Sequence, residues 1–312
     1  IMRRRQRQMC IRDSSNTVRT GPNGGNLSLS GLLNNGLVET NTGTTTTLLG
    51  NWSNPTGTLQ VNGGTLNLDG NFSGLGTFNR PGGAGTVNLT GTFTNTGNVF
   101  TFDDTTGVFN FDTGQITGGT LRKAGSGDLV LTQDSTLSGV TLDMDFAVPA
   151  AETLRLSSGL TVTAGNALRL QGGASSANVL ILGDMTLDGP GSLIFEGTTD
   201  NNDVRPLFGG IDLVLGPNLI VGAGSTRGGL IRNFATLDNQ GTIQALVPGS
   251  SVTLTAGTLT NSGIITIAEG ATVSTSNVNL TNAATGTIGG SGRLDLDTGG
   301  AVESLVNLGV LQ

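Results

Sequence analysis

Four five-residue segments decide how this chain folds: Gly64-Thr-Leu-Asn-Leu68, Gly85-Thr-Val-Asn-Leu89, Gly107-Val-Phe-Asn-Phe111 and Gly127-Asp-Leu-Val-Leu131. They follow one another at steps of 21, 22 and 20 residues, and two further apolar positions follow each of them. A period in the twenties, with three short strands separated by Gly, Asn and Thr turns, is typical of a β-solenoid, because each coil buries its inward face only against its neighbours. The sequence therefore predicts an all-β parallel β-helix with about 20–22 residues and three short strands per coil, and about 13 coils in all.

The repeat also predicts which side chains form the core. Residues at equal positions in successive coils should stack in buried columns. Three columns are expected: Leu66, Val87, Phe109 and Leu129; Phe72, Phe93, Ile116 and Leu137; and Phe78, Val99, Leu121 and Leu142. Trp52 is in phase with the second column, so we interpret it as a core residue and not as a sugar-stacking platform.

The composition agrees with a chain rich in turns and strands. Gly accounts for 52 of the 312 residues, aromatic residues make up 4%, and Tyr and His are absent. Abundant Gly, Ser, Asn and Thr with little charge would also suit a disordered linker. The alternation in Leu66-Asn67-Leu68 argues against disorder, because it places one set of side chains inside and the other in water. No amphipathic helical stripe is sustained over three turns, which again favours an all-β chain.

Residues 1–19 differ from the rest of the chain. They contain six of the 15 basic residues and the single cysteine, Cys10, without a strand pattern. A signal peptide would need an apolar run of about 7 to 15 residues, and this segment has no such run. A nucleic-acid-binding arm is poorly supported, because the body that follows is acidic. The segment from Arg5 to Ser14 resembles a translated adaptor sequence, so we expect a non-native or disordered leader over 1–19, with the export signal missing, and a single β-solenoid over 20–312.

Beyond residue 19 the chain carries a strong negative charge. Nine basic and 21 acidic residues give this part a net charge of −12. An acidic surface repels the phosphates of nucleic acids and anionic lipid headgroups, so we expect no nucleic-acid partner and no direct membrane insertion. No apolar run approaches the roughly 18 residues of a membrane-spanning helix.

A second form of the repeat occupies the last third of the chain. Leu237-Asp-Asn239-Gln-Gly241 is followed by equivalent segments, which begin at Leu259, Leu280 and Leu305. The Asn is expected to accept the left-handed backbone conformation and to hydrogen-bond to its counterparts one coil above and below. The Gly is expected to supply the positive φ that the corner requires. Another apolar column should contain Val252, Val273 and Leu294.

Two polar stretches interrupt the pattern, at 197–206 and 222–229. The first contains two Asn and two Asp residues and a Pro, and the second contains four Gly residues and a Ser, all of which are common in turns. We therefore expect long loops around 197–229 that project from the coils.

The F/L-T-N-x-G repeats, such as Phe93-Thr-Asn95-Thr-Gly97 and Leu259-Thr-Asn261-Ser-Gly263, resemble the right-handed parallel β-helix of bacterial surface proteins. These proteins include autotransporter passengers and filamentous-haemagglutinin-like adhesins. The resemblance covers about residues 26–312 and lies in the style of the repeat. It implies a secreted or cell-surface stalk, associated with the outer membrane, and it carries over no catalytic residue because the family has no universal active site.

The residues available for catalysis are limited. Without His, neither Ser-His-Asp nor Cys-His arrangements nor histidine metal sites can form. Glycoside hydrolysis needs two carboxyl groups about 5–9.5 Å apart. The candidate pairs are Asp103 with Asp104, Asp143 with Asp145, and Asp200 with Asp203. Pectinase-like β-helices add a Gly-His-Gly motif and a basic pair, which this chain lacks, so we interpret these pairs as solvated turn carboxylates and predict no catalytic residue.

A calcium site is the remaining option for the acidic residues. The segment Gly289-Gly-Ser-Gly-Arg-Leu-Asp-Leu296 approaches the calcium-binding repeat G-G-x-G-x-D-x-U-x. Leu294 takes the place of the ligating Asp, however, and the segment occurs once. We therefore predict no metal site and no cofactor, with Asp295 and Asp297 on the outward face.

These observations favour a non-catalytic structural or adhesive stalk. The alternative is a carbohydrate-active β-helix, a polysaccharide hydrolase or lyase, with a groove beside the 197–229 loops. An enzyme should bring several carboxylates or basic residues together on one concave face, whereas a stalk should scatter them. The expected partners are host-surface or polysaccharide ligands.

A third possibility is self-association through exposed coil ends. The last residues, 305–312, form a full repeat without a polar cap. Leu308, Val310 and Leu311 are therefore expected to line the uncapped end of a fragment, through which the chain should self-associate or at which it should fray.

Overall fold

Short stretches in which apolar and polar residues alternate form the strands of this protein. In Thr65–Leu68, for example, the two Leu side chains are buried while Thr65 and Asn67 face outward. The computed structural model describes residues 17–21, 25–225, 227–276, 278–297 and 304–312. The fold is a β-solenoid of about 13 turns with parallel sheets, 61% strand and 1% helix, which confirms the predicted fold class. The chain divides into two compact units, Ile1–Thr136 and Leu137–Gln312.

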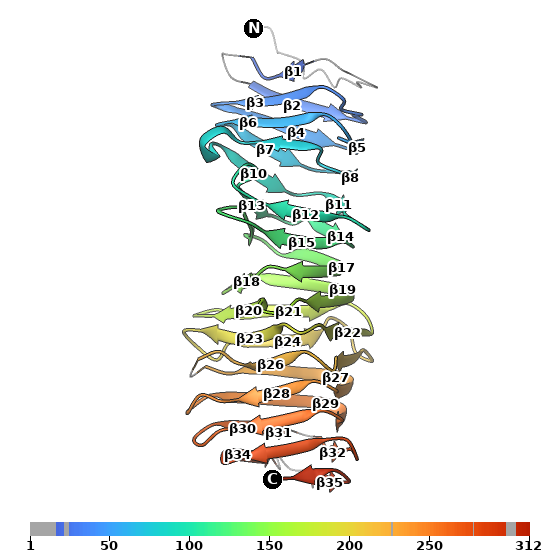
Figure 1. The fold of residues 1–312 in the computed structure, drawn as a ribbon, viewed down its shortest axis with the longest axis vertical. Coiled ribbons are helices and arrows are strands. Elements are labelled where there is room, and N and C mark those ends of the chain that lie inside the picture. Colours follow the sequence, from blue (N-terminus) through green and yellow to red (C-terminus); the bar gives the residue numbers. More distant parts are fainter. Residues whose placement is uncertain (1–16, 22–24, 226, 277, 298–303) are drawn as a thin grey trace. The chain divides into compact units, whose positions relative to one another are not determined.

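In the first unit, parallel strands stack into three faces (Figure 1). One face contains β1 (Thr17–Arg19), β3 (Leu37–Asn41), β6 (Thr58–Asn62) and β9 (Thr77–Asn79). The second contains β2 (Gly25–Ser30), β4 (Thr44–Leu49), β7 (Thr65–Leu68), β10 (Thr86–Leu89), β13 (Val108–Phe111) and β16 (Asp128–Leu131). The third contains β5 (Asn51–Ser53), β8 (Asn71–Ser73), β11 (Thr92–Thr94) and β14 (Gln115–Thr117). In the last two of these coils, β12 (Val99–Phe102) and β15 (Thr120–Lys123) follow β11 and β14 and pair with each other. A short 3₁₀ turn, η1 (Pro81–Gly83), follows β9.

The leader predicted over 1–19 is described only at its end. Residues 1–16 lie outside the described part of the chain. Thr17–Arg19 form β1, which pairs in parallel with β3, so strand pairing begins before residue 20.

The second unit repeats the same coil with longer strands. An eight-stranded sheet contains β18 (Phe146–Pro149), β20 (Ala167–Gly172), β23 (Ser192–Gly197), β26 (Ile220–Ala223), β28 (Thr242–Ala245), β30 (Ile264–Ile267), β33 (Thr287–Gly290) and β36 (Val310–Leu311). The other strands are β17 (Ser135–Asp143), β19 (Thr153–Val162), β21 (Ala177–Ile181), β22 (Met185–Asp188), β24 (Asn202–Pro206), β25 (Asp212–Leu215), β27 (Gly229–Asn239), β29 (Ser251–Asn261), β31 (Thr272–Ser276), β32 (Leu280–Asn282), β34 (Arg293–Asp297) and β35 (Leu305–Asn307). Leu308, Val310 and Leu311 are exposed. Their self-association stays a prediction.

The predicted core columns are present with one exception. Leu66, Val87, Phe109 and Leu129 are buried and occupy equal positions in β7, β10, β13 and β16. Trp52 stacks on Phe72 with ring centroids 4.2 Å apart, and Phe72 stacks on Phe93 at 5.2 Å. The indole is 4% exposed and donates a hydrogen bond to the Asp69 carbonyl at 2.7 Å, which confirms its place in the core.

The exception is Val99, which was assigned to the third column. Leu121 pairs with Phe100, and Val99 is 53% exposed. The ring of Phe100 packs against Phe93 and Phe102 instead. The assignment to Val99 is wrong because Val99 and Phe100 are both apolar and point to opposite faces of the strand, so the alternation does not show which of them is buried. The larger side chains of Phe100 and Phe102 face the interior.

A buried arginine occupies one corner of the first unit. Arg80 is 7% exposed and its guanidinium donates hydrogen bonds to five backbone carbonyls, the shortest to Gly85 at 2.5 Å and to Val108 at 2.6 Å. Burial lowers the pKa of this guanidinium. The bonds explain how a charged group is accommodated inside the coil, because each carbonyl replaces part of the hydration that the group loses.

The predicted asparagine ladder is present in the second unit. Asn239 donates to Asn261, Asn261 to Asn282 and Asn282 to Asn307, each at 2.7 Å. The predicted backbone conformation is wrong, however. We expected a left-handed conformation at the Asn and a positive φ at the Gly, but neither these Asn residues nor Gly263 have a positive φ. Glycine is needed at Gly263 for another reason: an added Cβ would collide with the carbonyl oxygen of Gly241. Val252, Val273 and Leu294 are in register as predicted.

The polar stretch 197–206, which was expected to be a long loop, is partly a strand. Asn202–Pro206 form β24, which pairs with β21 and β27. Asn202 and Asp203 are buried there because they have polar partners: Asn202 bonds to the Gly228 carbonyl at 2.7 Å and Asp203 binds Arg232 through two hydrogen bonds. Polar residues therefore belong to the strand wherever these bonds satisfy them.

Candidate functional site

The candidate carboxylates of the sequence hold turns and strands in place. Asp103 accepts hydrogen bonds from the backbone N–H and the hydroxyl of Thr105 and from the N–H of Thr106. Asp104 accepts 2.7 Å bonds from the N–H and the hydroxyl of Ser126 one coil further on. The Thr105 hydroxyl bond is the largest cause that holds the pKa of Asp103 below its ordinary value, and the Ser126 N–H does the same for the pKa of Asp104. Both groups are therefore stabilised as carboxylates, which does not suit a general acid.

The two carboxylates of the second candidate pair, Asp143 and Asp145, bind different partners. Asp143 accepts a 2.8 Å bond from the hydroxyl of Thr163, and Asp145 accepts one of the same length from the N–H of Ala167. Asp145 also lies 3.4 Å from Arg169, which contacts Glu196 at 3.3 Å. The Asp143 and Asp145 side chains thus each fix a neighbouring coil.

The third pair lies beside the 197–229 stretch. Asp200 accepts a 2.7 Å bond from the N–H of Gly228. Asp203 is 5% exposed and contacts Arg232 at 2.8 Å and Arg205 at 3.4 Å. The hydrogen bond to Asp203 is the main cause that raises the pKa of Arg232. The buried carboxylate of Asp203 is therefore occupied by two partly exposed arginine side chains.

The segment 289–296, which resembles a calcium-binding repeat, offers few free ligands for a cation. Asp295 pairs with Arg293 at 2.7 Å, so a cation would have to displace a guanidinium from this carboxylate. Within the described ranges, no three His, Cys, Asp or Glu side chains gather into a group that could hold a metal ion. In the same part of the chain, no helix is long and apolar enough to cross a membrane.

A shallow groove on the first unit is the feature best shaped for a ligand. It has a volume of about 780 Å³, and ten residues from four successive coils line it: Gly31, Leu32, Leu33, Asn51, Trp52, Ser53, Asn71, Phe72, Ser73 and Thr94. This volume lies within the range of about 300–1,000 Å³ that is usual for small-molecule sites. None of the ten lining residues carries a charge at neutral pH.

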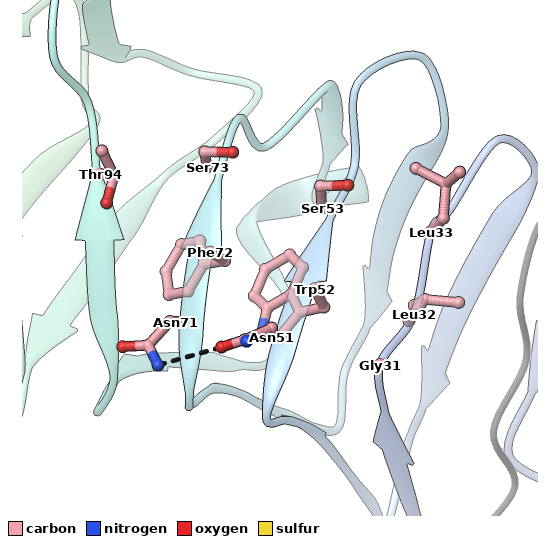
Figure 2. Close-up of a pocket in the computed structure, with 10 residues that line it drawn as sticks. All are labelled: Gly31, Leu32, Leu33, Asn51, Trp52, Ser53, Asn71, Phe72, Ser73 and Thr94. Atoms are coloured by element: carbon pink, nitrogen blue, oxygen red, sulfur yellow. Dashed lines mark hydrogen bonds between the residues drawn. The ribbon is translucent and has the colours of Figure 1, made fainter.

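The outward residues of three short strands form two polar rows in this groove (Figure 2). In the first row the amide of Asn71 donates to the carboxamide oxygen of Asn51 at 3.1 Å. The second row contains Ser53, Ser73 and Thr94, which are in register across β5, β8 and β11. Each row therefore presents a hydrogen-bonding side chain once per coil.

The floor and one end of the groove are apolar. The buried Trp52–Phe72 stack lies beneath the rows, and its packing fixes the strands that carry them. Leu33 pairs with Ser53 through a parallel bridge and is 38% exposed at the end of the groove. Just past this row, Asn34 and Asn54 are fully buried and joined by a 2.8 Å hydrogen bond, which holds the corner of the coil beside the groove.

The sequence alone predicts no functional role for the groove residues. The alternation of polar and apolar residues identifies Asn51, Asn71 and Ser73 only as exposed strand residues. They come together in one surface because the coils stack. The repeated tripeptides Asn51-Trp-Ser53 and Asn71-Phe-Ser73 are the signal that could have identified the two rows.

Comparisons with known proteins leave the family open: no family model, no curated protein and no solved structure matches this chain.

Proposed function

We propose that this chain is a non-catalytic structural and adhesive stalk of a secreted or surface-displayed bacterial protein. The observation that carries the proposal is the regular outward face of the coils. In the first unit, Asn67, Asn88 and Asn110 are joined by side-chain hydrogen bonds of 2.9 Å across three coils. Each coil in such a row presents the same side chain on its outer face. This arrangement suits a protein that presents a repeated binding surface along the stack of coils.

The contacts of the candidate carboxylates give further support. Asp104, Asp145 and Asp203 each have partners that fix a neighbouring coil or strand, and they lie on different turns of the chain. An acid–base pair would instead need two carboxyl groups directed into one groove. At the 197–229 stretch, where the catalytic alternative expects its groove, Asp203 is paired with Arg232.

The location and the adhesive role can be tested separately. Antibodies against the chain should label intact cells that produce it, and labelling only after lysis would contradict display at the surface. Beads coated with the full chain should be retained on host cells or polysaccharide films more strongly than beads coated with albumin. Equal release of the two kinds of bead from every surface would contradict the adhesive role.

A further inference from the structure

We propose that the groove between Leu33 and Thr94 binds an uncharged, polyhydroxylated chain, that is, a neutral polysaccharide that lies across the strands β5, β8 and β11. This inference rests on the adhesive function proposed above and specifies the class of ligand. It concerns only the first unit.

The chemistry of the lining is the first argument. The chain has a net charge of −7 and 37 ionisable Lys, Arg, Asp and Glu residues, yet none of the residues that line this groove is among them. Carboxamides and hydroxyls can each donate and accept hydrogen bonds, which matches the hydroxyl groups of a sugar. A charged ligand would find no partner of opposite sign in this groove, and burying its charge without one would be costly.

The geometry of the rows is the second argument. Asn51 and Asn71 form one row, and Ser53, Ser73 and Thr94 form the other (Figure 2). Neighbouring strands in a sheet are about 4.7–4.9 Å apart. This repeat is close to the length of one pyranose residue along a polysaccharide, so a linear chain could contact one coil with each sugar.

The rigidity of the site is the third argument. The strands that carry both rows are fixed from inside by the Trp52–Phe72 stack and at the corner by the buried Asn34–Asn54 pair. A site whose polar groups are already held in place loses little side-chain entropy on binding. Leu33 adds an exposed apolar contact for the carbon face of a sugar ring.

Calorimetric titration of the full chain tests the ligand class. The probes are cello- and xylo-oligosaccharides as neutral chains, oligogalacturonate as an anionic chain and chito-oligosaccharide amines as a cationic chain. We expect binding of a neutral chain with an affinity that is the same at low and high salt, because no charge contributes. Binding of the anionic or the cationic chain alone would overturn the proposal.

Charge variants at Ser73 locate the site. Both Ser73→Glu and Ser73→Arg should weaken binding of the neutral chain about tenfold, because each places a charge and extra bulk in the groove. The matched controls are Thr86→Glu and Thr86→Arg, at an exposed strand position on another face, and they should bind as the unmodified chain does. Asn71→Ala, which adds no charge, should also weaken binding. Circular dichroism confirms that each variant is folded.

The outcomes separate this inference from the proposed function. If Ser73 and Thr86 variants bind a neutral chain equally, the groove is not the site and the inference is overturned. If no neutral chain binds while coated beads still adhere to cells, the ligand class is wrong and the adhesive function stands. If coated beads also fail to adhere, both proposals are overturned.

Discussion

The side-chain amide of Asn261 donates a 2.7 Å hydrogen bond to the carboxamide oxygen of Asn282 one coil further on, and both residues are fully buried. Asn261 also accepts a bond of the same length from Asn239. The ladder begins at Asn239, whose own carboxamide oxygen has no partner among the described residues, because the preceding coil places Leu215 at this position. Hydrogen bonds between identical side chains thus fix the register of successive coils.

Asn261→Ala should therefore destabilise the protein by about 2–3 kcal/mol, because it leaves a donor on Asn239 and an acceptor on Asn282 without partners in the interior. The matched control is Asn88→Ala. Asn88 bonds to Asn67 and Asn110 in the same way, but on the half-buried outer face, where water can replace the lost bonds. We expect a cost below about 1 kcal/mol there. Urea denaturation measures both, and equal costs would contradict a structural role for the buried ladder.

Phe93→Ala should cost about 3–5 kcal/mol, as for other buried aromatic residues. Phe93 is 2% exposed and packs against Phe72 and Phe100. Val99→Ala should change the free energy of unfolding by less than about 0.5 kcal/mol, because Val99 faces solvent. A larger loss for Val99→Ala than for Phe93→Ala would mean that the register of β12 is wrong.

Gly263→Ala tests why the corner needs glycine. Gly263 has no positive φ, but an added Cβ would collide with the carbonyl of Gly241, so we expect a loss of about 1–3 kcal/mol from displaced backbone. Gly209→Ala is the control, since nothing lies within 4 Å of its added Cβ and its φ is not positive. Thermal unfolding that gives the same midpoint for both variants would contradict the close approach of the two coils.

The turn at Asp104 should respond to acid. Hydrogen bonds from Ser126 lower the pKa of Asp104 from its ordinary value of 3.8. A carboxylate whose pKa is lower in the folded state stabilises the fold above its unfolded pKa, and this contribution is lost as the pH falls through the folded pKa. The amide resonance of Ser126 should therefore titrate with a midpoint below 3.8, and Asp104→Asn should abolish the titration. A midpoint at or above 3.8 in the unmodified chain would contradict the bonding of Asp104.

The sequence predicted the repeat, the coil length and most of the core columns, because period-two alternation and regular spacing depend on local residues. It did not predict the burial of Arg80, because an isolated arginine between Asn79 and Pro81 is typical of an exposed turn, and two of its carbonyl partners, Thr106 and Val108, come from the next coil. Val99 was misplaced because both phases of its strand contain apolar residues. The groove could not be predicted either, because Leu33 and Thr94 lie about 60 residues apart in the chain, and only the stacking of coils places them in one surface.

The most direct test of the central claim is to measure retention and turnover in one experiment. The full chain is incubated with a panel of neutral and acidic polysaccharides, and both bound protein and newly formed reducing ends or unsaturated products are measured. A non-catalytic adhesive stalk predicts that protein is retained on at least one polysaccharide without product. Product that accumulates with time, and that Asp200→Asn or Asp203→Asn abolishes in a folded protein, would contradict this account and support a carbohydrate-active enzyme.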